Sequence, residues 1–300
     1  MSEHSTESDP SLFIGLVTHA GSARPQAQTD QGVALALQER LIYQGNTVKY
    51  SVCNENLLSP HMLDLVRGEV TASIAAELAA EGRWRIYLNS SSQGLRLKGE
   101  LLLRSAYRRL RLSPPWQRDL SASEPGAKML KRLANIELAH ISLLEQAIQS
   151  GADWALILED DAHIADLDAT AAALGHFLNE RSGSSQPQYV NVSQSFTPKV
   201  LGTDSLGVRV RNWSEGKQIL SMDQPVTNTV CAVLYSKNFV GMLLNEFRNI
   251  PLSPVLPIDW KLNVAIMNLV AEGKIGPGDC WQVEPAPFIQ GSMHPTAKSE

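Results

Sequence analysis

Three consecutive acidic residues, Glu159, Asp160 and Asp161, directly follow the apolar run at 154–158. Such a cluster is costly, because desolvating carboxylates is unfavourable and like charges repel each other. Alternate residues of an extended chain point to the same side, so Glu159 and Asp161 can share a face while Asp160 points away and orients the turn. Mg²⁺ and Mn²⁺ prefer carboxylate oxygens and often bridge to substrate phosphates. The triplet therefore predicts a divalent-metal site, although a helix N-cap or a solvated turn uses the same residue types.

The triplet needs a strand to present it, and the run at 154–158 is typical of a strand buried on both faces. The clearest helix of the sequence precedes that strand. Its apolar residues recur three to five positions apart over 128–150, and Gly151 follows as a C-terminal cap. Arg132 lies near the start of this helix, where its guanidinium could reach a diphosphate or simply face solvent.

A strand–helix–strand unit comes earlier in the chain. The apolar run at 12–17 and the β-branched alternation at 47–52 predict two strands, and 31–43 has helical spacing between them. In open α/β sheets, ligands bind beyond the carboxyl ends of the strands. The residues that follow these two strands are therefore candidates for nucleotide binding: Thr18, His19 and Asn54.

Composition and charge narrow the class of protein. The chain has 300 residues and a formal net charge of −5, which argues against a nucleic-acid partner. It contains no apolar stretch of about 18 residues, so we expect no transmembrane segment. The three cysteines are far apart, which argues against a disulfide framework or a zinc site. We expect a cytoplasmic protein, with peripheral membrane contact left open by the arginine-rich segment 104–111.

Several segments resemble glycosyltransferase family 25, the lipopolysaccharide-type β-glycosyltransferases. That family carries a helix with a Ser-His pair, a Gly-x-Asp/Glu-aromatic turn and an apolar strand that ends in Leu-Glu-Asp-Asp. The matching segments are Ala139-His140, Gly151–Trp154 and Leu158–Asp161, followed by Thr227–Ser236, Pro257–Asp259 and Pro287–Gln290. The resemblance covers roughly residues 128–292, with alanine in place of the family's serine, and we expect His140 to pack near the site.

The resemblance implies a GT-A fold, which is an α/β, Rossmann-like domain with a mixed, mostly parallel sheet flanked by helices. It implies a nucleoside-diphosphate-sugar donor, expected to be a UDP-sugar, and a Mn²⁺ or Mg²⁺ ion. The acceptor would be a glycan, a lipid-linked molecule or a small molecule. Glu159 and Asp161 would hold the metal, and His294 would complete its shell. Asp259, expected at a helix N-cap position, would act as the general base if the configuration is inverted, or would only cap the helix.

We expect residues 1–10 to form a disordered tail and residues 11–295 to form one GT-A domain. Its half at 11–125 would bind the nucleotide, and its half at 128–295 would hold the metal and the acceptor. The stretch 113–126 is rich in proline, serine and glycine, which predicts a mobile loop.

Two other functions stay open. A sugar-phosphate nucleotidyltransferase also combines a nucleotide-binding half with metal carboxylates, but usually carries a glycine-rich, basic loop after the first strand. The segment 19–25 is a poor version of that loop. A non-catalytic protein that binds a nucleotide-sugar or a glycan through a degenerate site is the other alternative.

Overall fold

Apolar and β-branched runs form the strands of this protein, and segments with apolar residues at helical spacing form its helices. The computed structural model describes residues 11–18, 26–54, 56–58, 124–181, 186–194, 209–214, 217–222, 230–249, 258–276 and 278–291. The helices are α1 (Gln26–Tyr43), α5 (Glu124–Ser150), α6 (Leu167–Glu180), α8 (Lys237–Asn249) and α9 (Ile258–Ala271). The strands are β1 (Ser11–Val17), β2 (Thr47–Cys53), β3 (Trp154–Glu159), β4 (Ala162–Ile164), β5 (Tyr189–Asn191), β6 (Arg209–Ser214), β7 (Lys217–Met222), β8 (Ala232–Ser236), β9 (Cys280–Glu284) and β10 (Phe288–Gln290).

Eight of these strands form one mixed sheet in the order β2-β1-β3-β8-β5-β9-β7-β6. β1 pairs in parallel with both β2 and β3, and β5 pairs in parallel with β9. β8 is antiparallel to β3 and β5, and β7 is antiparallel to β9 and β6. β7 and β8 therefore run opposite to the other six strands. The expected α/β class is confirmed, with a mixed sheet in which most strands share one direction.

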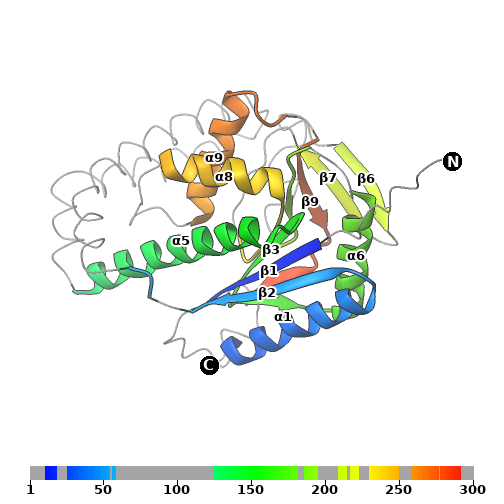
Figure 1. The fold of residues 1–300 in the computed structure, drawn as a ribbon, viewed down its shortest axis with the longest axis horizontal. Helices are drawn as coiled ribbons and strands as arrows, with labels where there is room; N and C mark the ends of the chain where they lie inside the picture. Colours follow the sequence, from blue (N-terminus) through cyan, green and yellow to red (C-terminus); the bar gives the residue numbers. More distant parts are fainter. Residues whose placement is uncertain are drawn as a thin grey trace, which may run out of the picture.

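Helices cover both faces of the sheet (Figure 1). On one face, Leu12, Leu156 and their alternating neighbours pack with buried residues of α1 and α6. On the other face, Phe13 and Ile157 pack with α5, α8 and α9. Successive strand residues point to opposite faces, so the continuous apolar runs at 12–17 and 154–158 supply both cores.

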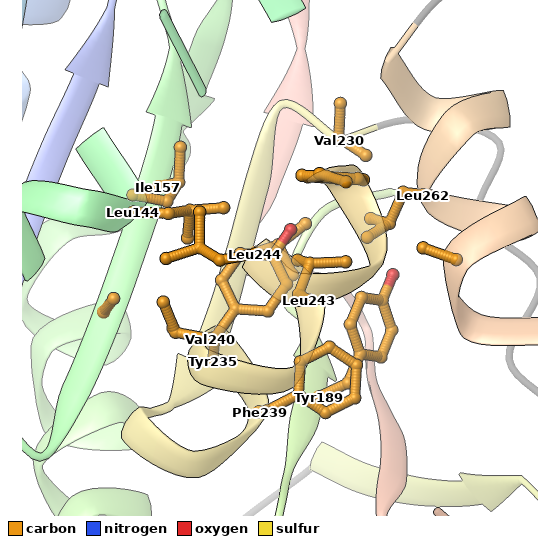
Figure 2. Packing of buried hydrophobic residues seen from close by; sticks show 14 of the residues in the cluster. Leu144, Ile157, Tyr189, Val230, Tyr235, Phe239, Val240, Leu243, Leu244 and Leu262 are labelled. Carbon is orange, nitrogen blue, oxygen red and sulfur yellow. The ribbon is translucent and has the colours of Figure 1, made fainter. Parts of the chain in front are cut away.

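The core beneath α5 is tightly packed where that helix crosses β1. A Cβ atom at Gly15 would lie 3.0 Å from Ile157 Cδ1 and 3.2 Å from Leu143 Cβ. Figure 2 shows the continuation of this core, in which Tyr189, Tyr235 and Phe239 gather beside the leucines of α8. The Tyr235 and Phe239 rings are stacked with their centroids 5.9 Å apart. Close packing of this kind fixes α5 against the strand that carries the acidic triplet.

One expectation about a segment boundary needs correction. Residues 124–126, assigned to a mobile loop, form the first turn of α5. A proline fits there, because the first helical N–H groups have no acceptor within the helix. The remainder of that loop, the tail at 1–10 and the arginine-rich segment 104–111 lie outside the described residues. The C-terminal stretch contributes two further strands, β9 and β10.

Candidate functional site

The acidic triplet lies at the carboxyl end of β3, beside the point where the strand order of the sheet reverses. The chain places β2 on one side of β1 and then β3 on the other side, and both pair with β1 in parallel. Val17 is in register with Glu159, and the amide N of Thr18 donates to the Cys53 carbonyl at 3.0 Å. The carboxyl ends of three neighbouring strands therefore meet here. Such a reversal point is where open α/β sheets bind ligands.

Asp160 is held by the end of the neighbouring strand. The Thr18 hydroxyl donates to Asp160 Oδ2 at 3.3 Å, and both side chains are buried. This contact joins two residues that were singled out for different reasons, one as the end of β1 and the other as the centre of the triplet. It fixes the turn after β3, which is the orienting role expected for Asp160.

Glu159 points the other way, toward α5. Its Oε1 atom lies 3.1 Å from Nε2 of His140, a residue that is almost fully buried. Its amide N donates to the Cys231 carbonyl at 2.8 Å, which extends the pairing of β3 with β8. Glu159 and Asp160 thus follow the alternation of an extended chain, and His140 packs near the site as expected.

Cys231 lies beside both outer acids of the triplet. Burial raises the pKa of its thiol well above the ordinary value, and the negative charges of Glu159 and Asp161 raise it further. The backbone contact between Glu159 and Cys231 places this thiol-bearing residue next to the end of β3. Ser193, which follows β5, hydrogen-bonds to this thiol, and its own hydroxyl donates to Asn191 Oδ1 at 2.7 Å. Cys231, Ser193 and Asn191 thus form a buried, hydrogen-bonded cluster next to the triplet.

The segment around β10 contacts β4 and the last residue of the triplet. β10 pairs with β4 in an antiparallel ladder, and the amide N of Gly291 donates to the Asp161 carbonyl at 2.6 Å. A Cβ atom at position 291 would overlap the His163 imidazole, so a larger residue there would require that ring to move. His294 follows Gly291 by three positions and lies outside the described residues. Its predicted metal contact stays a prediction.

Asp259 lies within the first turn of α9, which begins at Ile258. The expected N-cap position is therefore wrong, and the residue is instead an acid inside the helix. Such an acid is favourable there, because the helix dipole is positive at its N-terminus. Lys261, two residues later, forms a buried ion pair with Glu137 of α5. The first turn of α9 consequently lies against the part of α5 that also carries His140.

Of the other predicted nucleotide-binding residues, the structure describes Asn54 and Arg132. Asn54 follows β2 and is exposed, next to the backbone contact between Cys53 and Thr18. Arg132 is exposed near the start of α5. The Leu57 amide N donates to Asn135 Oδ1 at 2.7 Å, so the chain beyond β2 runs along this helix. His19 lies outside the described residues.

Sequence reasoning gave no role to Cys231, Ser193, His163 or the Glu137–Lys261 pair. A lone cysteine or serine has no recognisable spacing, and their positions follow from long-range strand pairing. The sequence could have indicated that Glu137 lies near His140, because residues three positions apart share one face of a helix.

The donors present fit a divalent metal that arrives with a phosphate-bearing ligand. Glu159 and Asp161 supply hard carboxylate oxygens, and the two residues lie two positions apart at the end of β3. Mg²⁺ sites commonly use about one or two carboxylates and take further oxygens from substrate phosphates and water. Within the described part of the chain, no group of three or more His, Cys, Asp or Glu side chains forms a ready-made metal site.

No protein-family model matches the chain, and no curated protein matches it. The resemblance to glycosyltransferase family 25 therefore stays a prediction. In the described residues, no helix combines the length and the apolar character that a membrane crossing requires.

Proposed function

We propose that this protein is a metal-dependent glycosyltransferase of the GT-A type. It would transfer a sugar from a nucleoside-diphosphate-sugar, expected to be a UDP-sugar, to an acceptor hydroxyl in the synthesis of a glycan or glycoconjugate. One observation carries the proposal: the contact between Thr18 and Asp160 at the point where the strand order reverses. It brings the acidic triplet to the place where α/β sheets bind nucleotides.

We assign separate roles in metal binding, nucleoside binding and positioning to the residues around this point. Glu159 and Asp161 would hold the metal, while Thr18 and Asn54, at the ends of their strands, would lie beside the nucleoside. A bound Mn²⁺ or Mg²⁺ ion would act as a Lewis acid on the leaving diphosphate. Asp160 and His140 would keep the carboxylates in place through their contacts at 3.3 and 3.1 Å.

Asp259 would take the proton from the acceptor hydroxyl. Its carboxylate is half-buried in the first turn of α9, which the Glu137–Lys261 pair ties to the same helix as His140. A general base must first reach the hydroxyl, and α9 packs on the face of the sheet toward which Glu159 points. If Asp259 is this base, the configuration at the transferred sugar would be inverted.

Thermal shift with a panel of nucleotides tests this proposal. UDP, GDP, CDP and ADP are each added with and without Mn²⁺, and a second series uses nucleoside triphosphates with sugar phosphates. A ligand at 100 times its Kd stabilises the folded state by about 2.7 kcal/mol, which raises the Tm by several degrees. We expect a rise with one diphosphate, UDP first, that requires Mn²⁺.

A response confined to triphosphates with sugar phosphates would favour a nucleotidyltransferase. A metal-independent response to sugars alone would favour a binding protein. Either result would contradict the proposed function.

A further inference from the structure

The backbone of Glu159 is fixed, but its side chain needs a second anchor. Strand pairing holds its amide N at 2.8 Å from the Cys231 carbonyl, and Val17 is its partner in the register with β1. A glutamate side chain still rotates about three bonds, and holding it in one conformation has an entropic cost. The contact with His140 Nε2 provides that anchor for one of the two carboxylate oxygens.

His140 is itself rigidly placed. Its side chain is only 4% exposed, and it lies on α5, which packs tightly on β1 and β3. Glu137, three residues earlier on the same face of α5, forms the buried ion pair with Lys261 of α9. A helix held from both sides in this way keeps the imidazole in one position relative to β3.

The contact leaves the other carboxylate oxygen of Glu159 for a ligand. A carboxylate only accepts hydrogen bonds, so Nε2 carries the hydrogen in this contact. His140 occupies Oε1, and the Glu159 side chain retains 20% exposure. The imidazole is more deeply buried than the carboxylate, with 4% of its side chain exposed.

We propose that His140 is a positioning residue, which fixes the Glu159 carboxylate for metal and nucleotide binding without touching the substrate. This inference rests on the proposed function. Groups that orient a metal-binding carboxylate typically contribute about 10–100-fold to metal affinity. The effect of His140 should therefore appear in binding, before any sugar is transferred.

Two substitutions of equal polarity test the role. In His140→Gln the amide nitrogen lies close to the position of Nε2 and can still donate to Glu159. In His140→Asn the side chain is one methylene shorter and cannot reach. Calorimetry measures the affinity of Mn²⁺ in the presence of UDP, and a thermal melt measures stability. Val240→Ala, which trims the same core on α8, is the control for lost packing alone (Figure 2).

We expect His140→Asn to weaken Mn²⁺ binding by about tenfold or more, and His140→Gln to stay within about threefold of the wild type. Val240→Ala should lower the Tm and leave the affinity unchanged. Equal affinity of the Asn and Gln variants, whether both normal or both reduced, would overturn the positioning role while the wild type still binds. A wild type that binds UDP without Mn²⁺, or not at all, would overturn the proposed function together with this role.

Discussion

Two buried acidic sites touch α5, and they are built differently. Glu137 is paired with the Lys261 ammonium between α5 and α9, where both side chains are at most 1% exposed, and the Phe247 ring lies 5.6 Å from that ammonium. Asp160 and Glu159 are instead contacted by a threonine hydroxyl and a histidine ring nitrogen. In the first arrangement, the Lys261 ammonium neutralises the buried Glu137 carboxylate. The second joins two neighbouring carboxylates at the carboxyl end of β3 to a hydroxyl and an imidazole.

This comparison asks whether the acids at the end of β3 are structural, like Glu137, or bind a ligand as proposed. Neutralising a buried carboxylate within the protein is a requirement of folding, since an unpaired buried charge is strongly destabilising. Under the proposed function, a bound metal ion would supply positive charge to Glu159 and Asp161. The predictions that follow ask to which of the two groups each residue belongs.

Asp259 is expected to behave like the acids of the second group. Asp259→Asn should lower the rate of sugar transfer by about 10²–10⁴-fold, because asparagine cannot accept the acceptor's proton. The affinity for UDP should be retained, since the base contacts the acceptor and not the diphosphate. Slow hydrolysis of the UDP-sugar by water can replace transfer in the assay.

Normal turnover in Asp259→Asn with a lowered Tm would place Asp259 with the structural acids. It would also favour a retaining mechanism or a different base.

Lys261→Met tests the structural pair. It leaves Glu137 buried without its lysine, which should lower the free energy of unfolding by about 3–5 kcal/mol. Chemical denaturation measures this loss. The double variant with Glu137→Leu should recover most of it, because removing both charges removes the unpaired carboxylate. A large loss of UDP affinity in the double variant at normal stability would show that this pair belongs to the binding site.

Thr18→Val should have the smallest effect. Valine keeps the shape of threonine and removes only the hydroxyl that donates to Asp160, which costs about 1 kcal/mol in stability. The affinity for UDP should change by less than about threefold if the hydroxyl serves Asp160 alone. A loss above tenfold at unchanged Tm would instead indicate direct contact between Thr18 and the nucleotide.

Local patterns were sufficient to predict much of the fold. The apolar run that forms β3, the spacing of α5 and the positive φ of 79° at its capping residue Gly151 all follow from short-range sequence signals. β9 is harder to predict, because Gly276, Pro277 and Gly278 precede Cys280–Glu284 and Pro285 follows it, and such residues are typical of loops. The order of the strands depends on long-range pairing, which no local pattern contains.

The directions of Glu159 and Asp160 in the triplet could be predicted from the sequence, but the contacts around the triplet could not. Alternation along β3 separated Glu159 from Asp160 before any contact was known. Asp259 was placed at the cap because acids favour both the N-cap and the first helical turn, and residue type does not distinguish the two. The contacts of His140 and Cys231 with Glu159 could not be predicted, because they depend on how α5 and β8 pack against β3.

The central claim is that the triplet binds a nucleoside diphosphate through a divalent metal, and Asp161→Asn tests it most directly. Asparagine has nearly the shape of aspartate, so the unliganded Tm should stay close to that of the wild type. With saturating UDP and Mn²⁺, the wild type should melt several degrees higher, and Asp161→Asn should not respond. An equal rise in both proteins, or a wild-type rise with UDP that does not depend on Mn²⁺, would contradict the account.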